Sequence, residues 1–75
     1  MLFPRRVLAV LSEAGGPLPI FALNTALLDQ SLAALAEDGD PGEAAFDRGE
    51  LAGLLALLTN LGAIAYDGYQ VALAA

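Results

Sequence analysis

The length of this chain sets the first limit on its fold, because 75 residues can enclose one hydrophobic core and no more. A chain of this size hides only about 60% of the surface that it exposes when unfolded, and its free energy of unfolding is expected to be about 4 to 11 kcal/mol. There is no cysteine or histidine, so neither a disulfide nor a tetrahedral zinc site adds stability. Residues 1–75 are therefore expected to form one domain that depends on packing and association.

The apolar content is high for so small a chain, since hydrophobic residues make up 57% of it. A membrane-spanning helix needs about 20 mainly apolar residues. The longest uncharged stretch, Leu51–Tyr66, is shorter, so no membrane span is expected. Arg5 and Arg6 precede an apolar run that meets Glu13 too early for a secretory signal, which favours a cytoplasmic protein.

The first segment predicts a helix from Phe3 to Ala14, because its apolar residues recur at spacings of three and four. Pro4 suits the first turn, where its missing N–H costs nothing. Gly15 and Gly16 are expected to end this helix. The apolar face consists of Phe3, Val7, Leu8, Leu11 and Ala14.

A second helical pattern begins at Pro19 and has two interpretations. Either one helix runs from Pro19 to about Glu37, or it breaks near Asp29, whose side chain would cap another short helix. The polar patch of Asp29, Gln30 and Ser31 slightly favours the break. The pattern is carried by Ile20, Leu23, Leu27, Leu28, Leu32, Leu35 and Ala36.

Residues 37–43 are acidic and rich in turn formers, so they are expected to form an exposed loop, after which Phe46 packs its ring into the core. Asp47 and Glu50 form a D-x-x-E signal that resembles a capping box. It precedes the strongest helical pattern of the chain. Leu57 lies off the main stripe of that helix and belongs either to the core or to an interface. The main stripe is Leu51, Leu54, Leu55, Leu58 and Leu61.

The last segment predicts a β-hairpin, because an Asp-Gly pair lies between the β-prone runs 63–66 and 69–73. Both turn residues are expected to have positive φ, with Tyr66 and Tyr69 paired across the strands. A two-stranded hairpin is marginally stable alone, so it is expected to pack on the preceding helix.

This order of elements resembles the winged-helix domain. Residues 51–73 look like the third helix and wing of that family, and Pro17–Ile20 lies where such domains often place a short first strand. The segment from Asp29 to Asp47 departs from the family, which usually has a tight turn there, and it has room for a fourth helix. The resemblance implies a mainly α fold of three or four helices with a C-terminal two-stranded wing. It is carried by Leu51, Leu54, Leu55, Leu58, Leu61, Gly62, Ile64, Asp67, Gly68, Tyr69 and Val71.

Winged-helix domains often bind DNA through the third helix and the wing, so the resemblance implies a transcriptional regulator as an alternative. Charge argues against DNA binding by this chain alone, because residues 51–75 contain no lysine or arginine and duplex affinity depends on neutralising phosphates. The net charge of -6 also repels a polyanion. Arg5, Arg6 and Arg48 are the only cations, which leaves DNA contact to a dimer or to a complex with a basic partner.

Residue types also argue against metal binding and catalysis. The acidic segment fails as a calcium loop, because Glu43 stands where the loop needs glycine and Gly49 stands where it needs the bidentate glutamate. There is no histidine, cysteine or lysine to activate a serine or threonine hydroxyl. The chain is therefore expected to be non-catalytic, with no metal and no cofactor.

The surplus of apolar residues favours a protein-protein interaction, through self-association as a homo-oligomer or as an adaptor for a heterologous partner. Aromatic and aliphatic anchors would carry most of the binding energy. All three cations are arginines, a bias common in proteins from GC-rich bacterial genomes. The candidate interface residues are Phe21, Leu57, Tyr66, Tyr69 and Leu73.

Overall fold

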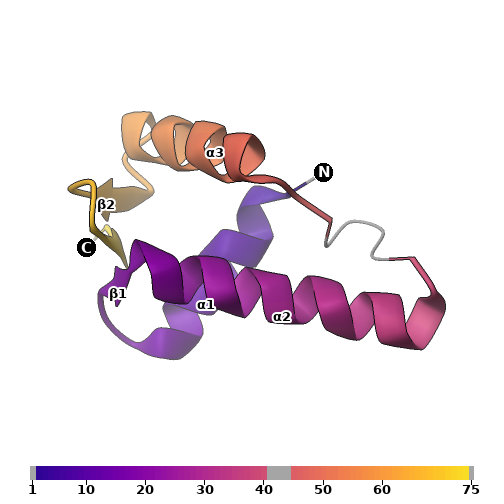
Figure 1. The fold of residues 1–75 in the computed structure, drawn as a ribbon. Helices are drawn as coiled ribbons and strands as arrows, with labels where there is room; N and C mark the ends of the chain where they lie inside the picture. Colours follow the sequence, from indigo (N-terminus) through magenta and orange to yellow (C-terminus); the bar gives the residue numbers. More distant parts are fainter. Residues whose placement is uncertain (1, 41–44, 75) are drawn as a thin grey trace.

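Three α-helices and three short β-strands are formed by the part of the chain that the computed structural model describes, residues 2–40 and 45–74 (Figure 1). This arrangement agrees with the expected mainly helical fold with a small β-hairpin, in its three-helix version, and adds one strand to the sheet. The elements in chain order are α1 (Pro4–Ala14), β1 (Leu18–Pro19), α2 (Ile20–Asp38), α3 (Arg48–Asn60), β2 (Ile64–Tyr66) and β3 (Gln70–Leu73).

Helix α1 confirms the first predicted helix and its end at Ala14, although the helix starts at Pro4, one residue after the predicted Phe3. Pro4 occupies the first turn, and the helix ends at Gly15, whose φ of 72° lies in the left-handed region that glycine adopts without strain. The Gly15 N–H closes the end by donating to the carbonyl oxygen of Leu11 at 3.3 Å. The buried side chains of α1 are Val7, Val10 and Leu11.

Helix α2 is continuous, so the slightly favoured break near Asp29 is wrong. Asp29 is exposed in the middle of the helix, and Gln30 accepts a hydrogen bond from Arg6 Nη1 of α1 at 3.0 Å. The polar patch therefore faces water and α1 rather than capping a new helix. The helix continues to Asp38 and ends at Gly39, with φ of 72°, so Glu37 and Asp38 are helical and not part of a loop. Gly39 and Asp40 are exposed and not helical, as predicted for the loop, and its remaining residues 41–43 lie outside the described residues.

Helix α3 begins at the predicted cap. The Asp47 carboxylate accepts a hydrogen bond from the Glu50 N–H at 2.8 Å. The Glu50 carboxylate does not complete the capping box. It accepts instead from the Leu2 N–H at 2.9 Å and so connects the N-terminal segment to α3. Phe46 packs against the core, as expected.

The strands form one antiparallel sheet in the order β1-β3-β2. The hairpin is confirmed, but its predicted turn is wrong, because Tyr66 lies opposite Val71 rather than Tyr69. The Asp67 carboxylate accepts hydrogen bonds from the N–H groups of Tyr69 (2.9 Å) and Gln70 (2.7 Å), which moves the loop one residue along the chain. Of the two predicted turn residues, only Gly68 has a positive φ, 96°.

The core lies where the three helices and the sheet meet. In Figure 1, α1 crosses behind α2, and α3 lies above them next to the hairpin. The C-terminal half of α2 extends beyond this crossing, and none of its residues after Leu27 is buried. The buried residues are Leu2, Val7, Val10, Leu11, Leu23, Leu27, Leu51, Leu55, Leu58, Ile64 and Val71.

Candidate interaction surface

The five predicted interface residues are distributed over α2, α3 and the hairpin. Phe21 on α2, Leu57 on α3, Tyr69 at the hairpin loop and Leu73 on β3 are exposed. Leu57 was expected to belong either to the core or to an interface. Its side chain is 51% exposed, so it is not a core residue. Tyr66 is half-buried and packs against the core.

Phe21 belongs to a longer apolar row on α2 that sequence reasoning missed. The row, here called the α2 stripe, consists of Phe21, Thr25, Leu28, Leu32 and Leu35. All five side chains are exposed. The fractions are 62% for Phe21, 43% for Leu28, 61% for Leu32 and 46% for Leu35. A surface that leaves four large apolar side chains in one row is typical of a contact site.

The spacing of the α2 stripe is that of a coiled-coil seam. Its residues follow one another at intervals of four, three, four and three, an average of 3.5 residues, which keeps successive side chains aligned along one side of a helix. From Phe21 to Leu35 the stripe is about 21 Å long, at 1.5 Å per residue. A second helix is the partner whose side chains fit such a row.

The polar member of the α2 stripe is compatible with burial against a partner. The Thr25 hydroxyl donates a hydrogen bond to the carbonyl oxygen of Phe21 at 2.9 Å within the same helix. Because this O–H donor is already satisfied, covering Thr25 leaves no unpaired hydroxyl donor behind. The stripe itself carries no charge, so no ion has to be desolvated when it is covered.

The opposite side of α2 holds the helix on the domain. Leu23 is 0% exposed and Leu27 is 1% exposed, and both contact the core. The two sides of α2 are therefore both apolar, one inside the molecule and one outside. The sequence contains both rows, but they were combined into one helical pattern, which did not separate the exposed Leu28, Leu32 and Leu35 from the buried residues of the helix.

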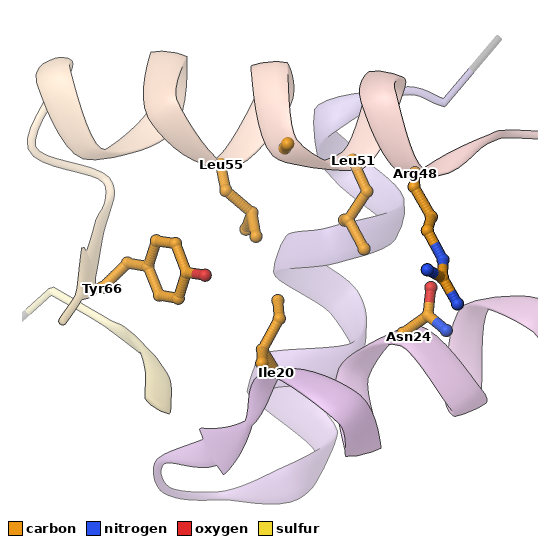
Figure 2. Close-up of a pocket in the computed structure, with 7 residues that line it drawn as sticks. Ile20, Asn24, Arg48, Leu51, Leu55 and Tyr66 are labelled. Carbon is orange, nitrogen blue, oxygen red and sulfur yellow. The ribbon is translucent and has the colours of Figure 1, made fainter. Parts of the chain in front are cut away.

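A shallow groove of about 250 Å³ lies between the N-terminal half of α2, α3 and β2 (Figure 2). Its walls are apolar, with Ile20 on one side and Leu51 and Leu55 on the other. In Figure 2 the Arg48 guanidinium from the start of α3 lies beside the Asn24 amide of α2. The complete lining is Ile20, Asn24, Arg48, Leu51, Ala52, Leu55 and Tyr66.

The ionisable groups do not form a reactive centre in the described part of the chain. The N–H groups of Gln70 and Tyr69 lower the pKa of Asp67, which stabilises its charged form and the hairpin loop. Among residues 2–40 and 45–74, no group of three or more acidic, histidine or cysteine side chains is placed to hold a metal ion. No helix in these residues has the length and apolar character needed to cross a bilayer.

Comparison with models of protein families, with curated proteins and with solved structures gave no match. The function is therefore argued from the chain's own surface, of which the α2 stripe is the most ordered apolar feature.

Proposed function

We propose that this protein is a small acidic, non-catalytic interaction domain that binds another protein through the α2 stripe. The observation that carries the proposal is the 4-3-4-3 row of exposed side chains from Phe21 to Leu35. Covering such a row removes apolar area from water, which contributes about 25 cal/mol of favourable free energy per Å² buried. No charge has to be desolvated. A cytoplasmic location is part of the proposal, supported by a composition without cysteine.

A winged-helix-like architecture is also part of the proposal. It is supported by the element order helix, strand, helix, helix, strand, strand and by the sheet order β1-β3-β2. The short first strand falls at Leu18–Pro19, within the segment where the resemblance implied one. In this architecture α3 and the hairpin correspond to the third helix and the wing.

Charge favours a protein partner over DNA. From Arg48 to Ala74, the only basic side chain is that of Arg48, at the first residue of α3. Phosphate neutralisation by several lysines or arginines supplies most of the affinity for duplex DNA, and α3 and the hairpin lack them. The α2 stripe instead offers the aliphatic and aromatic groups that dominate protein interfaces.

Photo-crosslinking in the producing cells tests the proposal. A benzophenone amino acid is placed at position 32, on the α2 stripe, and in a separate variant at position 12, on the exposed polar side of α1. We expect a discrete protein adduct from position 32 and none from position 12. The absence of any adduct at position 32, or equal adducts at both positions, would contradict the proposed contact surface.

A further inference from the structure

We infer that the partner of the α2 stripe is a second copy of this chain, with the two α2 helices antiparallel about a two-fold axis near the middle of the stripe. This inference rests on the proposed function and names its partner. It follows from the symmetry of the stripe, from the charges at the two ends of α2 and from the position of Arg48.

The α2 stripe is suited to meet a copy of itself. A two-fold interface requires that one surface fit its own copy in the reversed direction. The intervals of four and three from Phe21 become three and four when the row is followed from Leu35, so the reversed row has the same alternation. The small Thr25 side chain leaves space for a leucine of the opposite helix, and the neighbouring Ala22 and Ala36 allow close approach.

The charges at the ends of α2 favour the antiparallel direction. The last turn carries Glu37 and Asp38, while the first turn carries no acidic residue. A parallel pair would bring four carboxylates together at the negative ends of two helix dipoles. The antiparallel pair places each acidic end beside the positive end of the other helix, which lowers the electrostatic energy.

Arg48 extends this complementarity. Asn24 and Asp38 lie on the same flank of the α2 stripe, because they are two heptads apart. In an antiparallel pair, that flank of one helix faces the same flank of the other, so Asp38 of one copy lies near the start of the other copy's α2, on the flank that carries Asn24. Arg48 lies beside Asn24 in Figure 2, where it supplies a cation for the incoming carboxylate.

The size of the α2 stripe limits the strength of the dimer. A seam about 21 Å long is short compared with standard stable interfaces. Asp29 lies on the other flank, where the two copies place like charges near each other. We therefore expect a reversible dimer that dissociates on dilution in the micromolar range.

Sedimentation equilibrium over a dilution series tests for the second copy. The variants are Leu32→Glu in the α2 stripe and, as a matched control, Leu57→Glu, another exposed leucine on α3. Both sites are exposed in the single chain, so both variants are expected to keep the helical circular dichroism spectrum. We expect Leu32→Glu to raise the dissociation constant at least tenfold and Leu57→Glu to change it less than twofold. Equal effects of the two variants would overturn the inference.

Disulfide trapping tests the relative direction of the two α2 helices. Because the chain has no natural cysteine, every disulfide must form between introduced cysteines. One variant carries Phe21→Cys and another carries Leu35→Cys. Each variant is oxidised alone, and an equimolar mixture of the two is oxidised in a third reaction. An antiparallel pair gives the mixed disulfide in preference to either like pair, whereas a parallel pair gives the like pairs.

Charge reversal tests the same arrangement independently. Arg48→Glu and Asp38→Arg are each expected to weaken the dimer severalfold, with association recovered when the two changes are combined. Like-pair disulfides, or no recovery, would overturn the antiparallel arrangement.

The mass of the photo-crosslinked adduct at position 32 separates this inference from the proposed function. An adduct of twice the chain mass supports the second copy. A heavier or lighter adduct, together with a monomer at all concentrations, overturns the inference and leaves the interaction domain standing. No adduct at all contradicts both.

Discussion

Helices α1 and α2 pack against the same core but differ in how many of their large apolar residues they bury. Every large apolar residue of α1, from Val7 to Leu11, is buried or half-buried, and its outer side is polar or small. Helix α2 buries Leu23 and Leu27 and leaves four large apolar residues in water. The core accounts for the whole apolar pattern of α1 and for only part of that of α2.

The difference teaches which part of the sequence is not explained by folding. The residues of α1 obey a single requirement, burial of one face, whereas α2 meets that requirement with two leucines and carries a second apolar row. Exposed apolar side chains do not stabilise the single chain, and they promote association. We therefore assign the second row of α2 to binding.

The largest expected difference in stability is between two leucine-to-alanine changes, one on the buried side of α2 and one on its exposed side. Leu23→Ala should lower the free energy of unfolding by about 2 to 5 kcal/mol, because it leaves a cavity in the core. Leu32→Ala should change it by less than about 0.5 kcal/mol in the dissociated chain. Urea unfolding at low protein concentration measures both values. Similar losses would break the distinction between the two rows.

The glycines that end the two helices provide the next comparison. Gly15 and Gly39 both have φ of 72° and have no atom near an added Cβ, so alanine adds backbone strain alone. Gly15→Ala should cost about 1 to 2 kcal/mol, because α1 leads directly into β1. Gly39→Ala should cost less, because the end of α2 lies outside the core and opens locally. Thermal unfolding measures the difference, and a larger loss at Gly39 would contradict it.

A smaller effect is expected where the two helices are joined. Gln30→Ala removes the hydrogen bond from Arg6 Nη1 and should cost about 1 kcal/mol. Gln30→Glu keeps an acceptor for the guanidinium and should cost less. If both variants are as stable as the wild type in chemical unfolding, this bond does not hold the middle of α2 against α1.

The smallest effect concerns the hairpin that both helices contact. The pKa of Asp67 is lowered in the folded chain from its ordinary value of 3.8. The charged carboxylate therefore stabilises the fold at pH values above 3.8. This contribution is lost as the pH falls below 3.8 and the carboxylate becomes protonated. Carbon-detected NMR titration should show the low pKa, and Asp67→Asn should remove the pH dependence of the Tyr69 and Gln70 amide signals. An ordinary pKa would contradict the two hydrogen bonds.

Much of the fold was predictable because it depends on local signals. Pro4 and Gly15 fixed the ends of α1, and Asp47 fixed the start of α3. The turn was misplaced because the Asp67 carboxylate captures two N–H groups, an interaction that outweighs the usual preference for an Asp-Gly turn. The hydrogen bond between Arg6 and Gln30, which joins residues distant in sequence, could not be predicted from local pattern.

The candidate surface was only partly predictable. Phe21 was identified because the apolar content exceeded what one core can hide. The sequence alone does not say which of two apolar rows on α2 faces the core, since that depends on where α1 and the sheet lie. The helical pattern therefore did not identify Leu28, Leu32 and Leu35 as surface residues.

An NMR dilution series of the wild-type chain tests the central claim most directly. As concentration rises, we expect backbone amide signals to shift at the α2 stripe and at the neighbouring Asn24, Asp38 and Arg48, while signals on the outer side of α1 remain fixed. Concentration-independent spectra, or shifts centred on α1 or the hairpin, would contradict the assignment of the α2 stripe as the surface where two copies meet.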